Sequence, residues 1–174
     1  GENGEGIVSE IKKYMPSHVQ LTIVGSIGKA LGIPGGLVAG ARSLVDQLKK
    51  SPSFTAASPI PPAYMYAFLK AQPIYWIARK KLKERVRQFQ HLVQGSGLFH
   101  YFGSYPVFYT RYNALADALA ETMLLSSFPY PHPDSEPVTR VVLNALHTEA
   151  DIDKLSEAVK RFVDSQGVCL TSNS

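Results

Sequence analysis

Cysteine is almost absent from this sequence, because its 174 residues include only Cys169. A single thiol cannot form a disulfide within the chain, so we expect a reducing compartment and a cytoplasmic location. Cys169 lies in an expected C-terminal tail over 167–174 and has no neighbouring base in the sequence. These features argue against a catalytic role for its thiol.

Long apolar runs and metal-ligand spacings are also missing. No stretch of about 18 apolar residues occurs, so we expect no membrane span, and no signal peptide is visible. His91, His100 and His132 do not show the spacing of metal ligands, so we expect no metal site. The opening segment 1–6 contains three glycines and lacks an initiator Met, which is typical of a loop inside a longer chain.

Charged residues make up only 18% of the chain, hydrophobic residues make up 45%, and the net charge is +4. The densest basic run, over 79–87, is interrupted by apolar residues at helical spacing. The apolar stripe consists of Ala78, Leu82, Val86, Phe89 and Val93. This pattern predicts an amphipathic helix with a solvated basic face, and we expect no nucleic-acid partner.

The periodicity and the turn residues predict a chain of alternating helices and strands. In the first part we expect a short helix over 7–14, a buried strand over 19–24, a strand over 37–39, a helix over 41–50 and a loop over 51–62. A long helical pattern covers about 63–93, with a break expected at Pro73 and an end at Gly95.

The last third of the chain predicts a small α/β unit. We expect strands over 107–110, 123–126 and 138–143, an irregular segment over 128–137, a helix over 113–121 capped by Asn113, and a helix from Thr148 to about Val163. Thr148 and Asp151 have the spacing of a capping box at the start of that helix. The expected organisation is therefore α/β, with one end of a larger layer over 1–62, a connecting helix over 63–97 and a small domain over 98–166.

A glycine-rich segment that contains Lys29 follows the first expected strand directly. A phosphate-binding P-loop would need glycine where Ile23 stands and Ser or Thr where Ala30 stands, and the glycine spacing of a dinucleotide fingerprint is also absent. A lysine that attacks an aldehyde must be neutral part of the time, which burial favours. Glycines admit a bulky ring, and a hydroxyl such as that of Ser26 can bind a phosphate. The segment is compatible with a buried Schiff-base lysine, but a lysine in a glycine-rich turn is more often an exposed turn residue, and the local pattern leaves both open.

Several stretches, in the right order, resemble the α-oxoamine synthases, which are pyridoxal phosphate (PLP) enzymes of type I fold. The matching stretches are Gly-Ser-Ile-Gly-Lys-Ala-Leu-Gly over 25–32, Gly-Gly-Leu-Val-Ala-Gly over 35–40, Ala-Ser-Pro-Ile-Pro-Pro-Ala over 57–63, Thr-Arg through Ala-Leu-His-Thr over 139–148, and Asp-Ile-Asp over 151–153. The opening segment 1–6 resembles the loop upstream of the family's lysine. The resemblance implies the C-terminal part of a PLP-dependent transferase, with 1–62 a remnant of the large PLP-binding domain.

The resemblance also implies a role for each of four residues. Lys29 would carry PLP as a Schiff base and later move the α-proton of the substrate. Ser26 would bind the cofactor phosphate, and Ser58 would reach the phosphate of a neighbouring subunit in a homodimer with shared sites. Arg140 would bind the substrate carboxylate, for which its planar fork of donors is suited. Ser58 stands where the family more often has Thr, which makes that contact less secure.

The implied reaction condenses an amino acid with an acyl-CoA, with loss of CO2, and biotin synthesis is the nearest expected setting. The family's residues that stack on the ring and pair with its nitrogen would lie upstream of this segment, so we expect the fragment alone to be inactive. Two alternatives stay open. One is a class II aminotransferase that uses the same lysine, and the other is a non-catalytic module of the same fold. His147, which precedes the capping Thr148, is expected to be structural.

Overall fold

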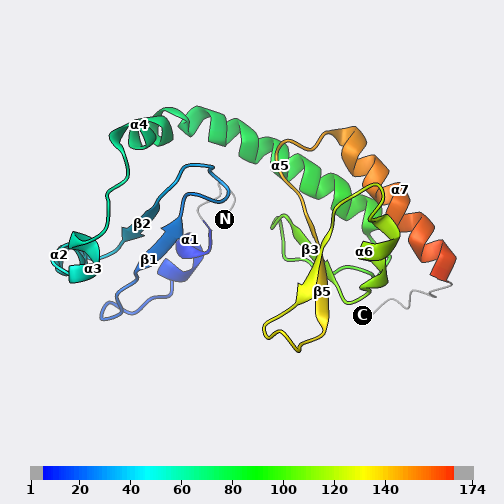
Figure 1. Ribbon diagram of the computed structural model, residues 1–174, viewed down its shortest axis with the longest axis horizontal. Coiled ribbons are helices and arrows are strands. Elements are labelled where there is room, and N and C mark those ends of the chain that lie inside the picture. The colour runs from blue at the N-terminus through cyan, green and yellow to red at the C-terminus, as the bar shows by residue number, and fades with distance from the viewer. Residues whose placement is uncertain (1–5, 167–174) are drawn as a thin grey trace. The chain divides into compact units, whose positions relative to one another are not determined.

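The computed structural model describes residues 6–166, and the chain divides into two units, Gly1–Ile77 and Ala78–Ser174 (Figure 1). The helix α5, Gln72–Val93, crosses the boundary between them.

The first unit combines a two-stranded sheet with short helices. Its elements are α1 (Val8–Lys12), β1 (Ile23–Ser26), β2 (Gly36–Ala39), α2 (Arg42–Lys49), α3 (Pro52–Thr55), α4 (Pro62–Lys70) and the first turns of α5. The strands β1 and β2 pair antiparallel, with Ile23 opposite Ala39 and Ser26 opposite Gly36. The expected helices over 7–14 and 41–50 are confirmed, and the expected loop over 51–62 contains the short helix α3.

The expectation of a buried strand over 19–24 is wrong in its position and in its burial. The strand β1 begins at Ile23, and its side chains are largely exposed, with Val24 at 77%. The cause is that β1 pairs with β2 alone among the described residues, so little protein packs on either face of the ladder. Apolar sequence thus predicted the strand type, while its burial requires partners outside this pair.

The long helical pattern is broken where Pro73 predicted a break. The helix α4 ends at Lys70, with Ala71 as its C-cap, and α5 begins at Gln72. Pro73 then occupies the first turn of α5, where the missing N–H has no helical acceptor to lose. At the other end, Gly95 adopts a φ of +82°, the left-handed conformation that ends helices, as predicted.

The second unit is a three-stranded antiparallel sheet with helices on one face. Its remaining elements are β3 (Val107–Thr110), α6 (Ala114–Leu119), β4 (Ser126–Pro129), β5 (Pro137–Val142) and α7 (Glu149–Gln166). The strand order β3-β5-β4 makes β5 central, with both neighbours antiparallel to it. The strand over 107–110 is confirmed at both ends, and the strand expected over 138–143 is confirmed to within one residue.

Two expectations in this unit are wrong. The strand predicted over 123–126 lies at Ser126–Pro129, within the segment expected to be irregular, because pairing with β5 decides its register. Asn113 is the N-cap residue of α6 but makes no capping hydrogen bond. Its side-chain oxygen instead accepts from the hydroxyl of buried Thr139 at 3.0 Å. A tertiary bond has therefore replaced the local one that sequence favoured.

The core of the second unit lies between α5, α7 and one face of the sheet. Phe89 is completely buried, and its ring lies 4.7 Å from that of Phe108 and 5.6 Å from that of Phe99. The predicted apolar stripe is confirmed, since Val86, Phe89 and Val93 are buried and Leu82 packs against the same cluster. Arg79, Lys80 and Arg87 are exposed, as expected of a solvated basic face. Arg85 departs from that expectation, because its side chain is only 11% exposed.

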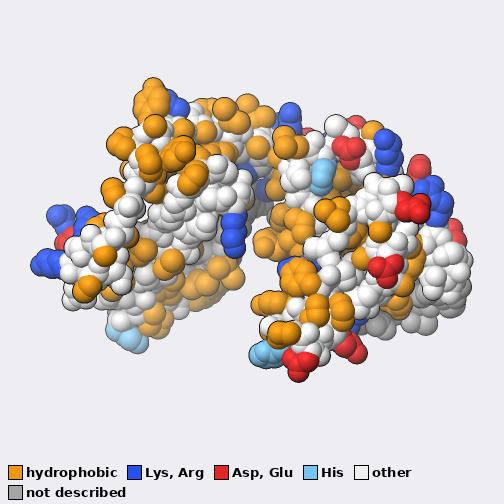
Figure 2. Space-filling model, in the orientation of Figure 1, with side chains coloured by type: hydrophobic (Ala, Val, Ile, Leu, Met, Phe, Trp, Pro, Cys, Tyr) orange, Lys and Arg blue, Asp and Glu red, His pale blue; other side chains and the backbone are white. Residues whose placement is uncertain are grey.

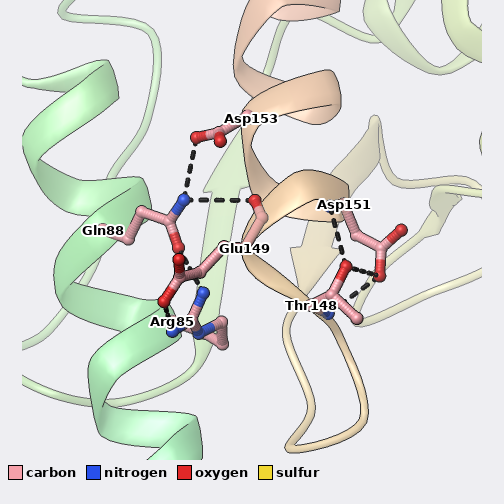
Figure 3. A network of polar contacts seen from close by, with 6 residues as sticks. All are labelled: Arg85, Gln88, Thr148, Glu149, Asp151 and Asp153. Carbon is pink, nitrogen blue, oxygen red and sulfur yellow. Dashed lines mark hydrogen bonds and ion pairs between the residues drawn. The ribbon is translucent and has the colours of Figure 1, made fainter.

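A polar network fastens the start of α7 to α5 (Figure 3). Arg85 forms an ion pair with Glu149 at 2.7 Å and donates to the side chain of Gln88 at 2.8 Å. The Gln88 amide donates to the Glu149 carbonyl and to the Asp153 carboxylate at 3.1 and 2.8 Å. The Arg85 side chain is only 11% exposed, and its donors bond to Glu149 and Gln88, so they stabilise the packing of α7 on α5.

Replacing Phe89 by Ala should lower the free energy of unfolding by about 3–5 kcal/mol, because it removes a fully buried ring and leaves a cavity among two other rings. Urea denaturation followed by circular dichroism measures the change. Phe54→Ala is the matched control: Phe54 is 57% exposed, so its replacement should change the same free energy by no more than about 0.5 kcal/mol. Equal losses in the two variants would contradict this account of the core.

Candidate functional site

Lys29 lies on a closed loop between β1 and β2. The backbone N–H of Ile27 donates to the Gly35 carbonyl at 3.0 Å, and that of Ile33 donates to the Ile27 carbonyl at 3.1 Å. Within the loop, the backbone N–H of Gly32 donates to the Lys29 carbonyl at 3.2 Å and forms a further turn. Ile27 and Ile33 are 7% and 8% exposed, the two buried apolar side chains of the first unit's described part. The loop is therefore anchored at its base while Lys29 stands at its tip.

Two later segments of the chain hold this loop from outside. The hydroxyl of Tyr75 on α5 donates to the Leu31 carbonyl at 2.9 Å. Gly35 has a φ of +144°, and a Cβ atom at this position would overlap the Ile60 side chain. Glycine is thus required here both by the backbone conformation and by the close approach of Ile60.

Ser26 ends β1 and faces the turn that follows it. The backbone N–H of Gly28 donates to its Oγ at 3.3 Å, which makes the hydroxyl an acceptor within the turn. A Cβ atom at Gly28 would lie 3.6 Å from this Oγ, so glycine leaves open space beside the hydroxyl. Because the turn uses the oxygen and not the hydrogen, the Ser26 hydroxyl can still donate to a ligand.

Lys29 is exposed in this structure, and the expectation that it is buried is wrong for the chain as described. Its ammonium makes no hydrogen bond or ion pair with any residue of 6–166. The physical cause is the same as for β1: the loop follows a two-stranded ladder with little protein around it. Its amine is therefore free to react, but the low-dielectric surroundings that favour a neutral lysine are not supplied by these residues.

Ser58 lies between α3 and α4 and is exposed. Within the described segments its hydroxyl has no hydrogen-bond partner. Two residues later, Ile60 contacts Gly35, so the Ser58 segment is attached to the base of the Lys29 loop. Ser26, Lys29 and Ser58 all lie in the first unit, and their predicted roles stay predictions.

Arg140 lies in the second unit, at the centre of β5. It is paired with Tyr109 on β3 and with Ser126 on β4, and its guanidinium carbon lies 4.3 Å from the centre of the Phe128 ring. Its Nε is buried without a hydrogen-bond partner, and the guanidinium forms no ion pair with the residues that the structure describes. Unlike those of Arg85, the donors of Arg140 are unpaired among the described residues, an arrangement suited to an anion such as a carboxylate.

The residues around these positions were not found by sequence reasoning. Tyr75 contacts Leu31 from 44 positions further along the chain, and Ile60 contacts Gly35 from 25 positions further along. Nothing in the local sequence pattern indicates such contacts. Phe128 was assigned to an irregular segment, although an aromatic residue two positions before a proline-rich turn is compatible with a strand end. Strand register, which places Phe128 beside Arg140, is not readable from the segment alone.

The C-terminal stretch that carried part of the resemblance has a structural role here. Thr148 and Asp151 form the predicted capping box: the Thr148 N–H and hydroxyl donate to the Asp151 carboxylate, both at 2.8 Å, and the Asp151 N–H donates back to the Thr148 hydroxyl at 3.2 Å. Ile152 is 1% exposed in the core, and Asp153 accepts from Gln88. The His147 ring accepts from the Asn144 N–H at 3.3 Å, a contact within the preceding turn.

Between residues 6 and 166, no group of three or more His, Cys, Asp or Glu side chains is arranged to hold a metal ion. No helix in that range is long and apolar enough to cross a lipid bilayer. Cys169 and the expected tail over 167–174 lie outside the described residues.

Residues 2–159 match the family model described as aminotransferase class I and II. The chain belongs to this family. Among curated relatives, it is similar to the 8-amino-7-oxononanoate synthase of Petrotoga mobilis, at 29% identity over 87% of this chain and 43% of the relative. The corresponding enzyme of Marinobacter nauticus is 30% identical over 80% of this chain and 38% of the relative.

Two solved structures show the same fold. An 8-amino-7-oxononanoate synthase of Francisella tularensis superimposes with a TM-score of 0.68 at 21% identity, over 85% of this chain and 47% of that one. A serine palmitoyltransferase of Sphingomonas wittichii gives a TM-score of 0.73 at 16% identity, over 97% of this chain and 45% of that one. The α/β transferase fold expected from sequence is confirmed, and the chain spans about half the length of the relatives that it matches.

The capping box predicts how stability depends on pH. The backbone N–H of Thr148, followed by its hydroxyl, lowers the pKa of the Asp151 carboxyl below its ordinary value, and Lys154 and His147 act in the same direction. A lowered pKa in the folded state gives stability that is present above the unfolded value of about 3.9 and is lost as pH falls through the folded value.

Asp151→Asn should therefore reduce the thermal stability of the protein at neutral pH, and the difference from wild type should shrink as pH falls below about 4. Melting followed by circular dichroism across this range measures the effect. Asp134→Asn, at an exposed loop position, is the control and should show no such pH-dependent difference. A gap between Asp151→Asn and wild type that stays constant with pH would rule out this account of the carboxylate.

Proposed function

We propose that this chain is the lysine-bearing part of a PLP-dependent acyltransferase resembling 8-amino-7-oxononanoate synthase. The intact protein condenses an amino acid with an acyl-CoA and releases CO2, free CoA and an aminoketone. The observation that carries the proposal is the anchored loop that presents the Lys29 amine three residues after the Ser26 hydroxyl. The names of the curated relatives support the same reaction.

The residues on the loop fit the cofactor. The amine of Lys29 is unpaired among the described residues, the Ser26 hydroxyl keeps its hydrogen for a phosphate oxygen, and Gly28 leaves space beside that hydroxyl. When bound, PLP withdraws electrons from the substrate α-carbon. Lys29 would hold the cofactor through its amine between turnovers and would move the α-proton of the substrate during them. Ser26 orients the phosphate, and Ser58 extends to the phosphate of the second subunit.

Arg140 is proposed to bind the substrate carboxylate. A guanidinium presents parallel N–H donors that match the two oxygens of a carboxylate. The free donors of Arg140 support this role, since the other arginine with a largely buried side chain, Arg85, spends its donors on Glu149 and Gln88.

We also propose that the chain divides into a part of the large domain over 1–62, a connecting helix over 63–97 and a small domain over 98–166.

The surface of the first unit supports a homodimer with shared sites. Figure 2 shows apolar side chains gathered over α4 and the start of α5. The exposed large apolar residues there are Tyr64, Met65, Tyr66, Leu69, Ile74, Trp76 and Ile77. A patch of this kind marks a surface that other polypeptide covers. We expect activity from the complete dimer, in the cytoplasm, and none from these 174 residues alone.

Borohydride treatment of the full-length protein with PLP should fix the cofactor to Lys29, because reduction makes the bond between the amine and the aldehyde carbon permanent. Peptide mass mapping locates the modified residue. Lys29→Ala should abolish the label, while Lys50→Ala, which removes an exposed lysine just after α2, should leave it intact. A label on a lysine other than Lys29 would overturn the assignment of the site.

Supplying the full-length protein with an amino acid and an acyl-CoA should release free CoA, measured with a thiol reagent, and Lys29→Ala should abolish the release. A class II aminotransferase, which the family description also covers, would instead transfer the amino group to a 2-oxo acid without releasing CoA. Transamination without CoA release would therefore replace the acyltransferase proposal with that alternative.

A further inference from the structure

We propose that Phe128 is a positioning residue for Arg140, holding the guanidinium in the orientation that binds the substrate carboxylate. This inference rests on the proposed function, and in particular on the substrate-binding role of Arg140. Phe128 is not itself expected to touch the reacting atoms.

The register of the sheet brings the two side chains together. Arg140 on β5 lies opposite Ser126 on β4, and Phe128 lies opposite Val138. Because side chains two residues apart on a strand share a face, Phe128 is the diagonal neighbour of Arg140 on the face that carries it. Thr139 and Val141, at alternate positions of β5, point into the core on the other face. The ring therefore packs against Arg140 from outside the core.

The contact has the geometry of a cation–π interaction. The guanidinium carbon lies 4.3 Å from the ring centre, well inside the range of about 6 Å over which such contacts are significant. An aromatic ring covers a flat face of the guanidinium and uses none of its N–H groups, which point outward in the plane. Stacking thus restrains the orientation of Arg140 without competing with a carboxylate for its donors.

The other surroundings of Arg140 also leave its donors unpaired. On the other side of Arg140, its cross-strand partner Tyr109 is itself stacked with His100, whose ring centre lies 5.4 Å away at an interplanar angle of 26°. Arg140 forms no ion pair with the residues that the structure describes. Phe128 is therefore the aromatic residue in contact with the guanidinium, and the charge of Arg140 remains available to an anion.

The test is steady-state kinetics of the full-length protein with the amino acid varied at saturating acyl-CoA. Phe128→Leu removes the π face but keeps apolar bulk, and it should raise KM for the amino acid about three- to tenfold with kcat changed less than twofold. Phe128→Tyr retains the ring and should restore KM to within about twofold of wild type. KM for the acyl-CoA should stay unchanged in both variants.

Two controls separate positioning from general damage. Phe54→Leu makes the same chemical change at an exposed position on α3 and should leave both KM values unaltered. Arg140→Lys should raise KM for the amino acid at least as much as Phe128→Leu does, since a lysine lacks the bidentate fork. The ring-current shift of the Arg140 Nε–H signal in NMR spectra should be lost in Phe128→Leu and kept in Phe128→Tyr.

The outcomes distinguish failure of the inference from failure of the proposed function. If Arg140→Lys raises KM and Phe128→Leu does not, Phe128 has no positioning role. Equal losses in Phe128→Leu and Phe128→Tyr would overturn it too, because the ring is present in the second. Absence of CoA release by the wild-type protein would instead refute the acyltransferase, while a ring-dependent Nε–H shift would still establish the contact.

Discussion

The pair of backbone hydrogen bonds that closes the loop over 27–35 is the constraint on which the site depends. They bring Ile27 against Gly35 and Ile33, and bury two apolar side chains at the base of an otherwise exposed loop. Without this closure, neither the Tyr75 hydroxyl nor the Ile60 side chain would have a fixed surface to contact. The placement of the Lys29 amine relative to the Ser26 hydroxyl follows from the same closure, because both residues lie within or beside it.

Arg85 and Arg140, two arginines of the second unit, illustrate how surroundings decide the use of a side chain. Arg85 and Arg140 are chemically identical, and both lie on elements that border one core. Arg85 contacts a carboxylate and an amide, so its donors fasten helix α7 to helix α5. Arg140 contacts an aromatic ring, which restrains it and leaves the donors unpaired. One arginine therefore stabilises the fold, and the other is suited to binding an anion.

Sequence reasoning succeeded wherever local chemistry decides structure. Pro73 predicted the break between α4 and α5, Gly95 the end of α5, and Thr148 with Asp151 the start of α7. It failed where long-range pairing decides. The register of β4 depends on β5, the side chain of Asn113 bonds to Thr139 instead of capping its helix, and Lys29 is exposed because its ladder has only two strands. The candidate residues were found by resemblance, whereas their supports, Tyr75, Ile60 and Phe128, required coordinates.

The close packing of Ile60 on Gly35 constrains the evolution of these two positions unequally. The backbone at Gly35 has a φ that side chains rarely adopt, so a larger residue is strained there even if its neighbour makes room. Ile60 can shrink to valine or alanine at the cost of a small void. Across homologous proteins, the position of Ile60 should therefore vary among aliphatic residues, while the position of Gly35 should remain glycine. Substitutions at the two positions should not compensate for one another.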